Sequence, residues 1–355
     1  MPKSILITGG AGFVGSSLAL LLKRDFPDCR VAALDNLKRR GSELNLSRLK
    51  RARVEFHHGD VRNPEDFDAV SGAEWLIDCA AEPSVLAGYG ASPSYVLNTN
   101  LSGTLNCLEY ARRNGASFIF LSTSRVYPIG PLASLRFESD ETRLRLAEGQ
   151  SVPGVSARGI SEDFPLGGAR SLYGSTKLAS ELFLAEYIDA YGIRGVINRC
   201  GVLTGPWQMG KVDQGVIVLW VASHVFGKPL SYIGFGGEGR QVRDILHVED
   251  LYSLLRFQLE NLDAHNGKVY NVGGGPEISV SLQELTRLCV EATGNEIGIR
   301  RSPENRPGDI PWYVTDTALV EKATGWKPVH SPREIVREIT DWIREHKQEL
   351  APILA

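Results

Sequence analysis

Short apolar segments alternate with longer amphipathic segments along the first half of the chain. The apolar segments have the length of buried strands and lie at residues 4–8, 31–35, 54–59, 75–79 and 117–122. Strands rich in Val, Ile and Leu that alternate with helices favour a parallel sheet covered on both faces. The pattern therefore predicts an α/β fold with a doubly wound parallel sheet.

Helical spacing marks residues 12–25, 93–114 and 173–191. Farther along, Gly/Pro-rich loops mix with short strands and helices, which predicts a smaller C-terminal α+β lobe. We expect one domain and one lobe. The domain comprises residues 1–197 plus about 242–270, and the lobe comprises residues 198–241 and 271–355.

An insertion at about residues 128–172 does not belong to a minimal sheet. It is polar and rich in Gly, Arg, Ser and Glu, and a structureless loop of this length is unusual in a compact domain. We interpret it either as a functional segment that covers a site or as a solvated surface insertion.

Composition and charge exclude several classes of protein. With 355 residues, 43% of them hydrophobic and 23% charged, the chain has the composition of a globular protein with two lobes. A net charge of −3 argues against nucleic acid as a partner. The longest apolar run, residues 216–226, is shorter than the roughly 20 residues that span a bilayer. Five scattered cysteines, no signal-peptide pattern and no metal-ligand spacing predict a cytoplasmic protein without a metal site.

A glycine-rich turn follows the first predicted strand, at residues 8–15. Glycines at 9, 12 and 15 allow a tight strand-to-helix turn and close approach of the backbone to a pyrophosphate, which the helix N-terminus attracts. Asp35 ends the next strand, where a carboxylate binds the adenosine ribose. The sequence thus predicts a Rossmann-type dinucleotide site.

Asp35 favours NAD over NADP, because its charge repels a 2′-phosphate. The basic residues 38–40 could offset that repulsion, or could be an ordinary solvated loop. Asp60 is interpreted either as an adenine contact or as a cap of the following helix. The residues expected to bind the cofactor are Gly9, Gly12, Phe13, Val14, Gly15, Asp35, Asn36, Asp60, Val61, Ala80, Ala81, Asn100, Tyr173 and Lys177.

Three residues predict oxidation chemistry. Tyr173 and Lys177 are four residues apart and therefore share one face of a helix. A tyrosine with its ordinary pKa of about 10 is a poor base at neutral pH unless a nearby cation such as Lys177 stabilises the phenolate. Thr123 follows the fifth predicted strand, at the sheet edge where doubly wound folds bind ligands.

Together these motifs resemble the extended short-chain dehydrogenases/reductases of the nucleotide-sugar epimerase/dehydratase group. The glycine turn, Asp35 and the Thr123, Tyr173 and Lys177 trio match that family. So do Asn-x-x-Gly-Thr at residues 100–104, Arg-Asp-x-x-His-Val-x-Asp at residues 243–250 and Arg-x-Gly-Asp at residues 306–309.

The resemblance implies an enzyme that uses NAD on a nucleotide-diphosphate sugar. By this resemblance, Arg243 and Arg306 would bind the diphosphate of the nucleotide sugar. An arginine suits a diphosphate because it is always charged and can donate two hydrogen bonds at once. The resemblance also implies a homodimer through the helices at 93–114 and 173–191, although their apolar positions fit packing within one subunit equally well. The residues expected to bind the substrate are Ser124, Arg125, Gln214, Arg240, Arg243 and Arg306.

The two residues directly after Thr123 limit which reactions of the family this chain can catalyse. Dehydratases of the group carry an Asp-Glu pair there for proton transfer, whereas this chain has Ser124 and Arg125, so we exclude dehydration. Arg125 either approaches the ligand or pairs with an acid of the insertion. His247, in the late motif, is interpreted as a structural residue.

Three features resemble the CDP-tyvelose (CDP-paratose) 2-epimerases: residues 122–127, the Glu-Thr-Arg at 141–143 and the Asp-Gln-Gly at 213–215. Against this resemblance, residues 199–202 replace an Asn-rich stretch that many relatives carry. From the three matching features we expect 2-epimerisation of a CDP-hexose by transient hydride transfer to NAD. A UDP-hexose 4-epimerase and a non-catalytic NAD-binding regulator are the alternatives.

Overall fold

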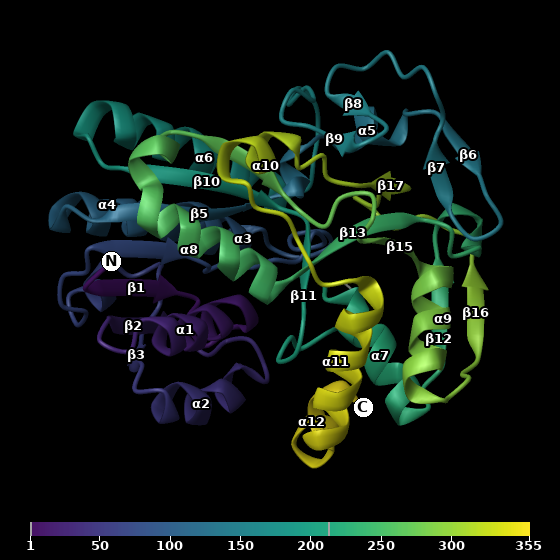
Figure 1. The fold of residues 1–355 in the computed structure, drawn as a ribbon, viewed down its shortest axis with the longest axis horizontal. Helices are drawn as coiled ribbons and strands as arrows, with labels where there is room; N and C mark the ends of the chain where they lie inside the picture. The colour runs from purple at the N-terminus through teal and green to yellow at the C-terminus, as the bar shows by residue number, and fades with distance from the viewer. Residues whose placement is uncertain (1, 212–213) are drawn as a thin grey trace. The chain divides into compact units, whose positions relative to one another are not determined.

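The computed structural model describes residues 2–211 and 214–355, which form two units (Figure 1). The first unit comprises Met1–Val126, Leu172–Arg199 and Leu251–Tyr270. The second comprises Tyr127–Ser171, Cys200–Asp250 and Asn271–Ala355.

A seven-stranded sheet organises the first unit, and its strand order is β14-β10-β5-β4-β1-β2-β3. The pairs from β5 to β3 are parallel. This arrangement confirms the predicted doubly wound α/β fold. The strands are β1 (Ser4–Thr8), β2 (Arg30–Asp35), β3 (Glu55–His58), β4 (Trp75–Asp78), β5 (Ser117–Thr123), β10 (Gly195–Cys200) and β14 (Val269–Val272).

Helices pack against this sheet. α1 packs on β2, α4 on β4 and β5, and α6 on β5. Leu6, Leu34 and Phe118 are fully buried in the core, since each comes from a central strand with both faces covered. The helices are α1 (Phe13–Asp25), α2 (Asn45–Arg51), α3 (Ser94–Leu97), α4 (Gly103–Asn114), α6 (Leu172–Tyr191) and α8 (Val248–His265).

The predicted helix at residues 93–114 is interrupted by one π-helical segment, Asn98–Ser102, between α3 and α4. Such a segment inserts one extra residue per turn and is frequent at functional sites. Two short 3₁₀ helices, Ser42–Leu44 and Pro64–Phe67, follow β2 and β3.

The second unit contains a mixed sheet in which β13 (Val242–His247) is central. β13 is parallel to β11 (Val202–Thr204) and β17 (Trp312–Tyr313), and antiparallel to β15 (Ser279–Ser281). A separate parallel pair joins β12 (Leu230–Ile233) to β16 (Ile299–Ser302).

Three helices of this unit pack together: α7 (Val216–Phe226), α9 (Leu282–Thr293) and α11 (Pro332–Glu345). α7 is the long apolar run of the sequence, and most of its side chains are buried. Two shorter helices, α10 (Ala318–Thr324) and α12 (Lys347–Leu354), follow in the C-terminal part. Among the described residues, no helix is both long enough and apolar enough to cross a membrane.

The insertion folds into two small hairpins after a short helix, α5 (Ile129–Ala133). The first hairpin pairs β6 (Phe137–Ser139) with β7 (Leu144–Leu146), and the second pairs β8 (Val155–Ser156) with β9 (Gly159–Ile160). The N–H of Ile160 donates to the carbonyl oxygen of Val314 at 2.8 Å. The insertion is thus an ordered part of the second unit.

Candidate active site

The glycine-rich turn between β1 and α1 is built so tightly that side chains are excluded. Gly9 has a φ of +62°, and a Cβ on Gly15 would lie 2.2 Å from the carbonyl oxygen of Gly9. Gly12 caps α1, and Phe13 and Val14 begin it, so the unbonded N–H groups of a first helical turn are concentrated here. This turn fits a pyrophosphate.

Asp35 closes the turn from the end of β2. Its carboxylate accepts hydrogen bonds from the N–H of Ala11 at 3.0 Å and from the N–H of Leu37 at 2.7 Å. Burial raises the pKa of this carboxyl above its ordinary value. Asp35 therefore fixes the glycine-rich turn, a role that the sequence motif alone does not indicate. Its contact with ribose stays a prediction.

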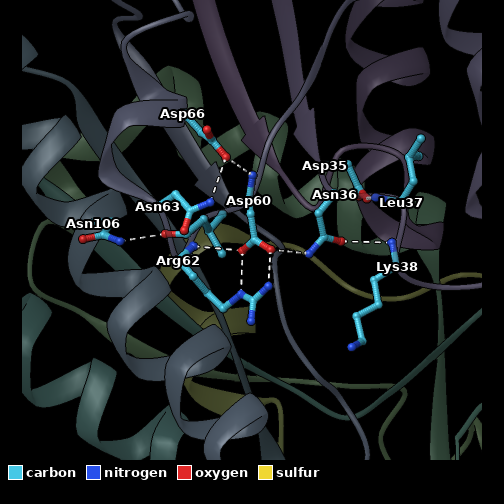
Figure 2. A network of polar contacts seen from close by, with 10 residues as sticks. Asp35, Asn36, Leu37, Lys38, Asp60, Arg62, Asn63, Asp66 and Asn106 are labelled. Carbon is cyan, nitrogen blue, oxygen red and sulfur yellow. Dashed lines mark hydrogen bonds and ion pairs between the residues drawn. The ribbon is translucent and has the colours of Figure 1, made fainter.

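Asp60, at the end of β3, is held by its neighbours (Figure 2). It accepts hydrogen bonds from Asn36 Nδ2 at 2.9 Å and from Arg62 Nε and Nη2 at 2.9 and 2.6 Å. The Arg62 guanidinium holds the pKa of Asp60 at about 2. The 3₁₀ helix that follows is capped by Asn63 without a side-chain bond, so the helix-cap interpretation of Asp60 is wrong. The carbonyl of Val61, the other predicted residue here, accepts a bond from Asn106.

A tyrosine that sequence reasoning missed lies beside this network. The ammonium of Lys38 stands 3.8 Å from the ring centroid of Tyr95, and the Arg62 guanidinium carbon stands 5.0 Å from it. A cation over an aromatic face is attracted by the ring quadrupole. Lys38 is nevertheless an exposed residue, so this contact is compatible with the solvated loop expected at residues 38–40.

Asn100 is fully buried in the π-helical segment. It accepts a bond from the N–H of Glu82 at 2.7 Å and donates to Thr176 Oγ1 at 3.2 Å. It thereby joins the loop after β4, which contains Ala80 and Ala81, to α6. The N–H of Ala80 is itself bonded to Asp78.

The three predicted catalytic residues all belong to the first unit. Thr123 ends β5, is 7% exposed, and accepts a hydrogen bond from the N–H of Arg125 at 3.2 Å. Lys177 is buried, and its Nζ donates to the carbonyl oxygen of Leu121 at 2.9 Å. Tyr173 is half-buried, one turn before Lys177 on α6. The Lys177 contact places this face of α6 against the strand that ends in Thr123.

A buried ion pair supports this arrangement. Glu181, one turn after Lys177, accepts from Ser122 Oγ at 2.5 Å and from Arg199 Nη2 at 2.7 Å. Arg199 lies in β10, 18 positions after Glu181, and only the fold brings the two side chains together. Ser122 directly precedes Thr123, so the pair also fixes the end of β5.

The remaining predicted substrate residues, apart from Ser124 and Arg125, lie in the second unit. Arg243 Nη2 donates to Asp309 Oδ1 at 2.8 Å, which joins the two late motifs. Half-buried Arg306 lies in the same loop as Asp309. Gln214 Oε1 and Arg240 Nε are buried and have no hydrogen-bond partner among the described residues. Asp213 lies outside the described residues.

His247 is a buried neighbour of a second histidine. Its ring centroid lies 4.3 Å from that of His330, and its Nε2 lies 3.3 Å from Glu338 Oε2. Within residues 2–211 and 214–355, no group of three or more His, Cys, Asp or Glu side chains is placed to hold a metal ion.

Comparison with known proteins agrees with this geometry. Residues 5–273 match the model of the NAD dependent epimerase/dehydratase family. The chain belongs to this family. The predicted family and the predicted NAD cofactor are confirmed, and the chain is accordingly an NAD-dependent enzyme.

Members of the family with different reactions are similar over nearly the whole chain. CDP-paratose 2-epimerase of Salmonella typhi is 31% identical over 352 residues, covering 95% of this chain and 98% of that protein. UDP-glucose 4-epimerase of Erwinia amylovora is 30% identical, covering 97% and 99%. The crystal structure of Thermus thermophilus UDP-glucose 4-epimerase with NAD has a TM-score of 0.77 at 27% identity, covering 96% and 99%.

Proposed function

We propose that the chain is a 2-epimerase of a CDP-hexose of the CDP-paratose/CDP-tyvelose type. The observation that carries the proposal is the segment after Thr123, where Ser124 and Arg125 stand in a short 3₁₀ helix, Ser124–Val126. Removal of water needs an acid and a base at this place, and neither residue is a carboxylic acid. The similarity to the Salmonella enzyme over nearly the whole of both chains supports the 2-epimerase reaction.

The chemistry of the sugar favours oxidation at C2 itself. Epimerisation requires a planar carbon, and a ketone at C4 would acidify the C–H bonds at C3 and C5 rather than at C2. When bound, NAD supplies a hydride acceptor that returns the hydride after the sugar has turned. The chain's own residues then have to move the hydroxyl proton and hold the oxygen.

Tyr173 would remove the proton from the 2-hydroxyl, and the buried ammonium of Lys177 would stabilise its phenolate. An ammonium has three N–H donors, and Leu121 takes one of those of Lys177. Thr123 Oγ1 accepts from Arg125, so its own O–H is directed to another acceptor, which suits a reacting oxygen.

The two units would divide the ligands between them. The first unit would bind NAD through the glycine turn, Asp35 and the loops after β3 and β4. The second would bind the nucleotide sugar through Gln214, Arg240, Arg243 and Arg306. Two atoms support this: Gln214 Oε1 and Arg240 Nε are buried and have no hydrogen-bond partner among the described residues.

The proposal includes a homodimer and a cytoplasmic location. α3 and α6 expose apolar side chains that a monomer would leave in water: Leu97 is 37% exposed, Leu182 64%, Phe183 41% and Tyr191 59%. Exposed apolar side chains on these two helices suit a two-fold interface. The cytoplasmic location is inferred from the cysteines, four of which are buried.

Proton NMR tests the reaction directly. The purified protein is incubated separately with CDP-paratose, CDP-glucose and UDP-glucose. We expect a new anomeric signal with a small H1–H2 coupling in a CDP tube only, and no solvent deuterium at C2. A galacto-configured product from UDP-glucose would establish the 4-epimerase alternative, which the Erwinia relative favours. Bound NAD with no turnover of any sugar would indicate the non-catalytic regulator.

A further inference from the structure

The tip of the β6–β7 hairpin is fastened to α9. Thr142 Oγ1 donates to Glu284 Oε1 at 3.0 Å, and Arg143 Nη2 donates to Glu284 Oε2 at 2.9 Å. The same Nη2 donates to the carbonyl oxygen of Ser279 at 2.8 Å. The Arg143 and Glu284 side chains are 17% and 26% exposed, so this charge-assisted contact is partly shielded from water. We call Thr142 and Arg143 the hairpin clip.

The anchor of the clip is itself rigid. Glu284 completes a capping box on α9, because its carboxylate accepts from the N–H of Ser281 at 2.9 Å while Ser281 Oγ accepts from the N–H of Glu284 at 3.1 Å. Ser281 also ends β15, which pairs with β13 opposite Val242. One carboxylate therefore holds the hairpin, the start of α9 and an edge of the mixed sheet together.

The hairpin and α9 hold the backbone around Arg240 from two sides. The N–H of Leu144, next to the clip, donates to the carbonyl oxygen of Arg240 at 2.9 Å. The N–H of Gln283, next to Glu284, donates to the carbonyl oxygen of Gly239 at 3.0 Å. The chain passes so close to Tyr232 that a Cβ on Gly239 would lie 2.8 Å from its ring. The backbone at Arg240 thus has little room to move.

The guanidinium of Arg240 is only partly satisfied by the protein. Its Nη1 lies 3.2 Å from Glu238 Oε2, while its Nε is buried without a partner among the described residues. A buried donor without an acceptor costs about 1–3 kcal/mol, which a ligand oxygen would recover. A diphosphate offers oxygens at the spacing that a guanidinium binds with two N–H groups.

We propose that the hairpin clip is a positioning element that holds Arg240 in place for the diphosphate of the nucleotide sugar. The inference rests on the proposed function, because it assumes that Arg240 binds that diphosphate. It assigns a role to the insertion: Thr142 and Arg143 act through the backbone of Leu144 and Arg240 without touching the ligand. A donor fixed in advance gives up less conformational entropy on binding.

Binding of CDP and UDP to the NAD-loaded protein, measured by calorimetry, tests the clip. We expect Arg143→Met to weaken binding of the preferred nucleotide about tenfold, within the range of coupling between contacting residues. Thr142→Val should have a smaller effect in the same direction. Arg145→Met is the matched control: Arg145 is on the same hairpin but pairs with Asp140 at the surface, with 61% exposure, and binding should not change.

A double-mutant cycle separates positioning from simple stabilisation. In the Arg240→Met background, Arg143→Met should have no further effect on nucleotide binding, and NAD affinity should be unchanged in every variant. Arg143→Lys, which keeps the charge, should restore part of the binding if Arg143→Met folds poorly. In turnover, KM should rise more than kcat falls.

Three outcomes would overturn the inference. Equal binding by Arg143→Met and Arg145→Met, or additive effects of Arg143→Met and Arg240→Met, would show that the clip does not act on Arg240. If the unaltered protein binds NAD but neither CDP nor UDP, the proposed function itself fails, which is a different result from the first two.

Discussion

Glu181 and Arg199 form a buried ion pair directly behind the strand that ends in Thr123. Two guanidinium nitrogens lie 2.7–3.1 Å from the carboxylate, and the two side chains are 5% and 7% exposed. Removing one partner of such a pair leaves an uncompensated charge in a medium of low polarity. The pair therefore makes the local packing of β5 and α6 depend on two residues that are 18 positions apart.

Glu181→Ala should lower the free energy of unfolding by about 3–5 kcal/mol, because the charge of Arg199 would remain buried. The double variant Glu181→Leu/Arg199→Met, which removes both charges, should be clearly more stable than the single variant. Urea denaturation followed by circular dichroism measures both. A double variant as unstable as Glu181→Ala would contradict this account.

Gly15→Ala should abolish tight NAD binding, since the new Cβ would lie 2.2 Å from the carbonyl oxygen of Gly9 and force the phosphate turn open. We expect stability to fall by about 1–3 kcal/mol as well, as for other overpacked sites. Gly298→Ala, where a Cβ would meet nothing within 4 Å, is the control. Calorimetric titration with NAD measures affinity, and an unchanged affinity in Gly15→Ala would refute the proposed turn.

Tyr173→Phe should reduce kcat at least about 100-fold, because the proposed base loses its hydroxyl. NAD affinity and the melting temperature should stay close to those of the unaltered protein. Tyr187→Phe on the same helix loses a hydroxyl that bonds Glu109, and it should keep its kcat. Comparable losses in the two variants would remove Tyr173 from the mechanism.

Arg62→Met should make the protein less stable at neutral pH by about 1–2 kcal/mol. Asp60 has its pKa lowered to about 2 by Arg62, whereas an unfolded Asp titrates near about 3.9. A carboxylate with a depressed folded-state pKa stabilises the fold above its unfolded pKa and loses that contribution as the pH falls toward 2. The lowered pKa of Asp60 corresponds to somewhat more than about 2 kcal/mol of folding free energy. We expect only about 1–2 kcal/mol because solvent screens the ion pair.

The difference between Arg62→Met and the unaltered protein should therefore shrink between about pH 5 and pH 2. Arg113→Met is the control, because Arg113 contacts Asp68 at 3.9 Å with both side chains exposed. Thermal melts over this pH range provide the measurement. A difference that is independent of pH would mean that Arg62 stabilises the fold by packing alone.

The alternating strands and helices of the fold were predictable from the local sequence pattern. Buried strands such as Ser117–Thr123 are short apolar runs. α6 is helical as predicted, but the face that it buries includes Lys177, Ser180 and Glu181, while Leu182 is 64% exposed. The interruption at Asn98–Ser102 was not predictable, because one π-helical turn hardly changes the spacing of apolar residues. The insertion's strands of two or three residues are too short to show any period.

The site was predictable only where its residues are close in sequence. The glycine turn and the spacing of Tyr173 and Lys177 are local patterns. Glu181 with Arg199, and Arg143 with Glu284, are contacts between distant segments, and only the folded chain brings each pair together. Asp60 is an intermediate case. Its partner Arg62 is only two positions away in the sequence, but the sequence motif suggested an adenine contact or a helix cap and not this ion pair.

The hydrogen bonds that Asp35 accepts from the backbone limit how this enzyme can be re-engineered. A designer who wants it to accept NADP would replace Asp35, because its charge opposes a 2′-phosphate. The same replacement would release the N–H of Ala11, which Asp35 holds inside the glycine-rich turn. Cofactor preference and cofactor affinity are therefore coupled through one carboxylate, and a switch of preference calls for a second substitution that restores the turn.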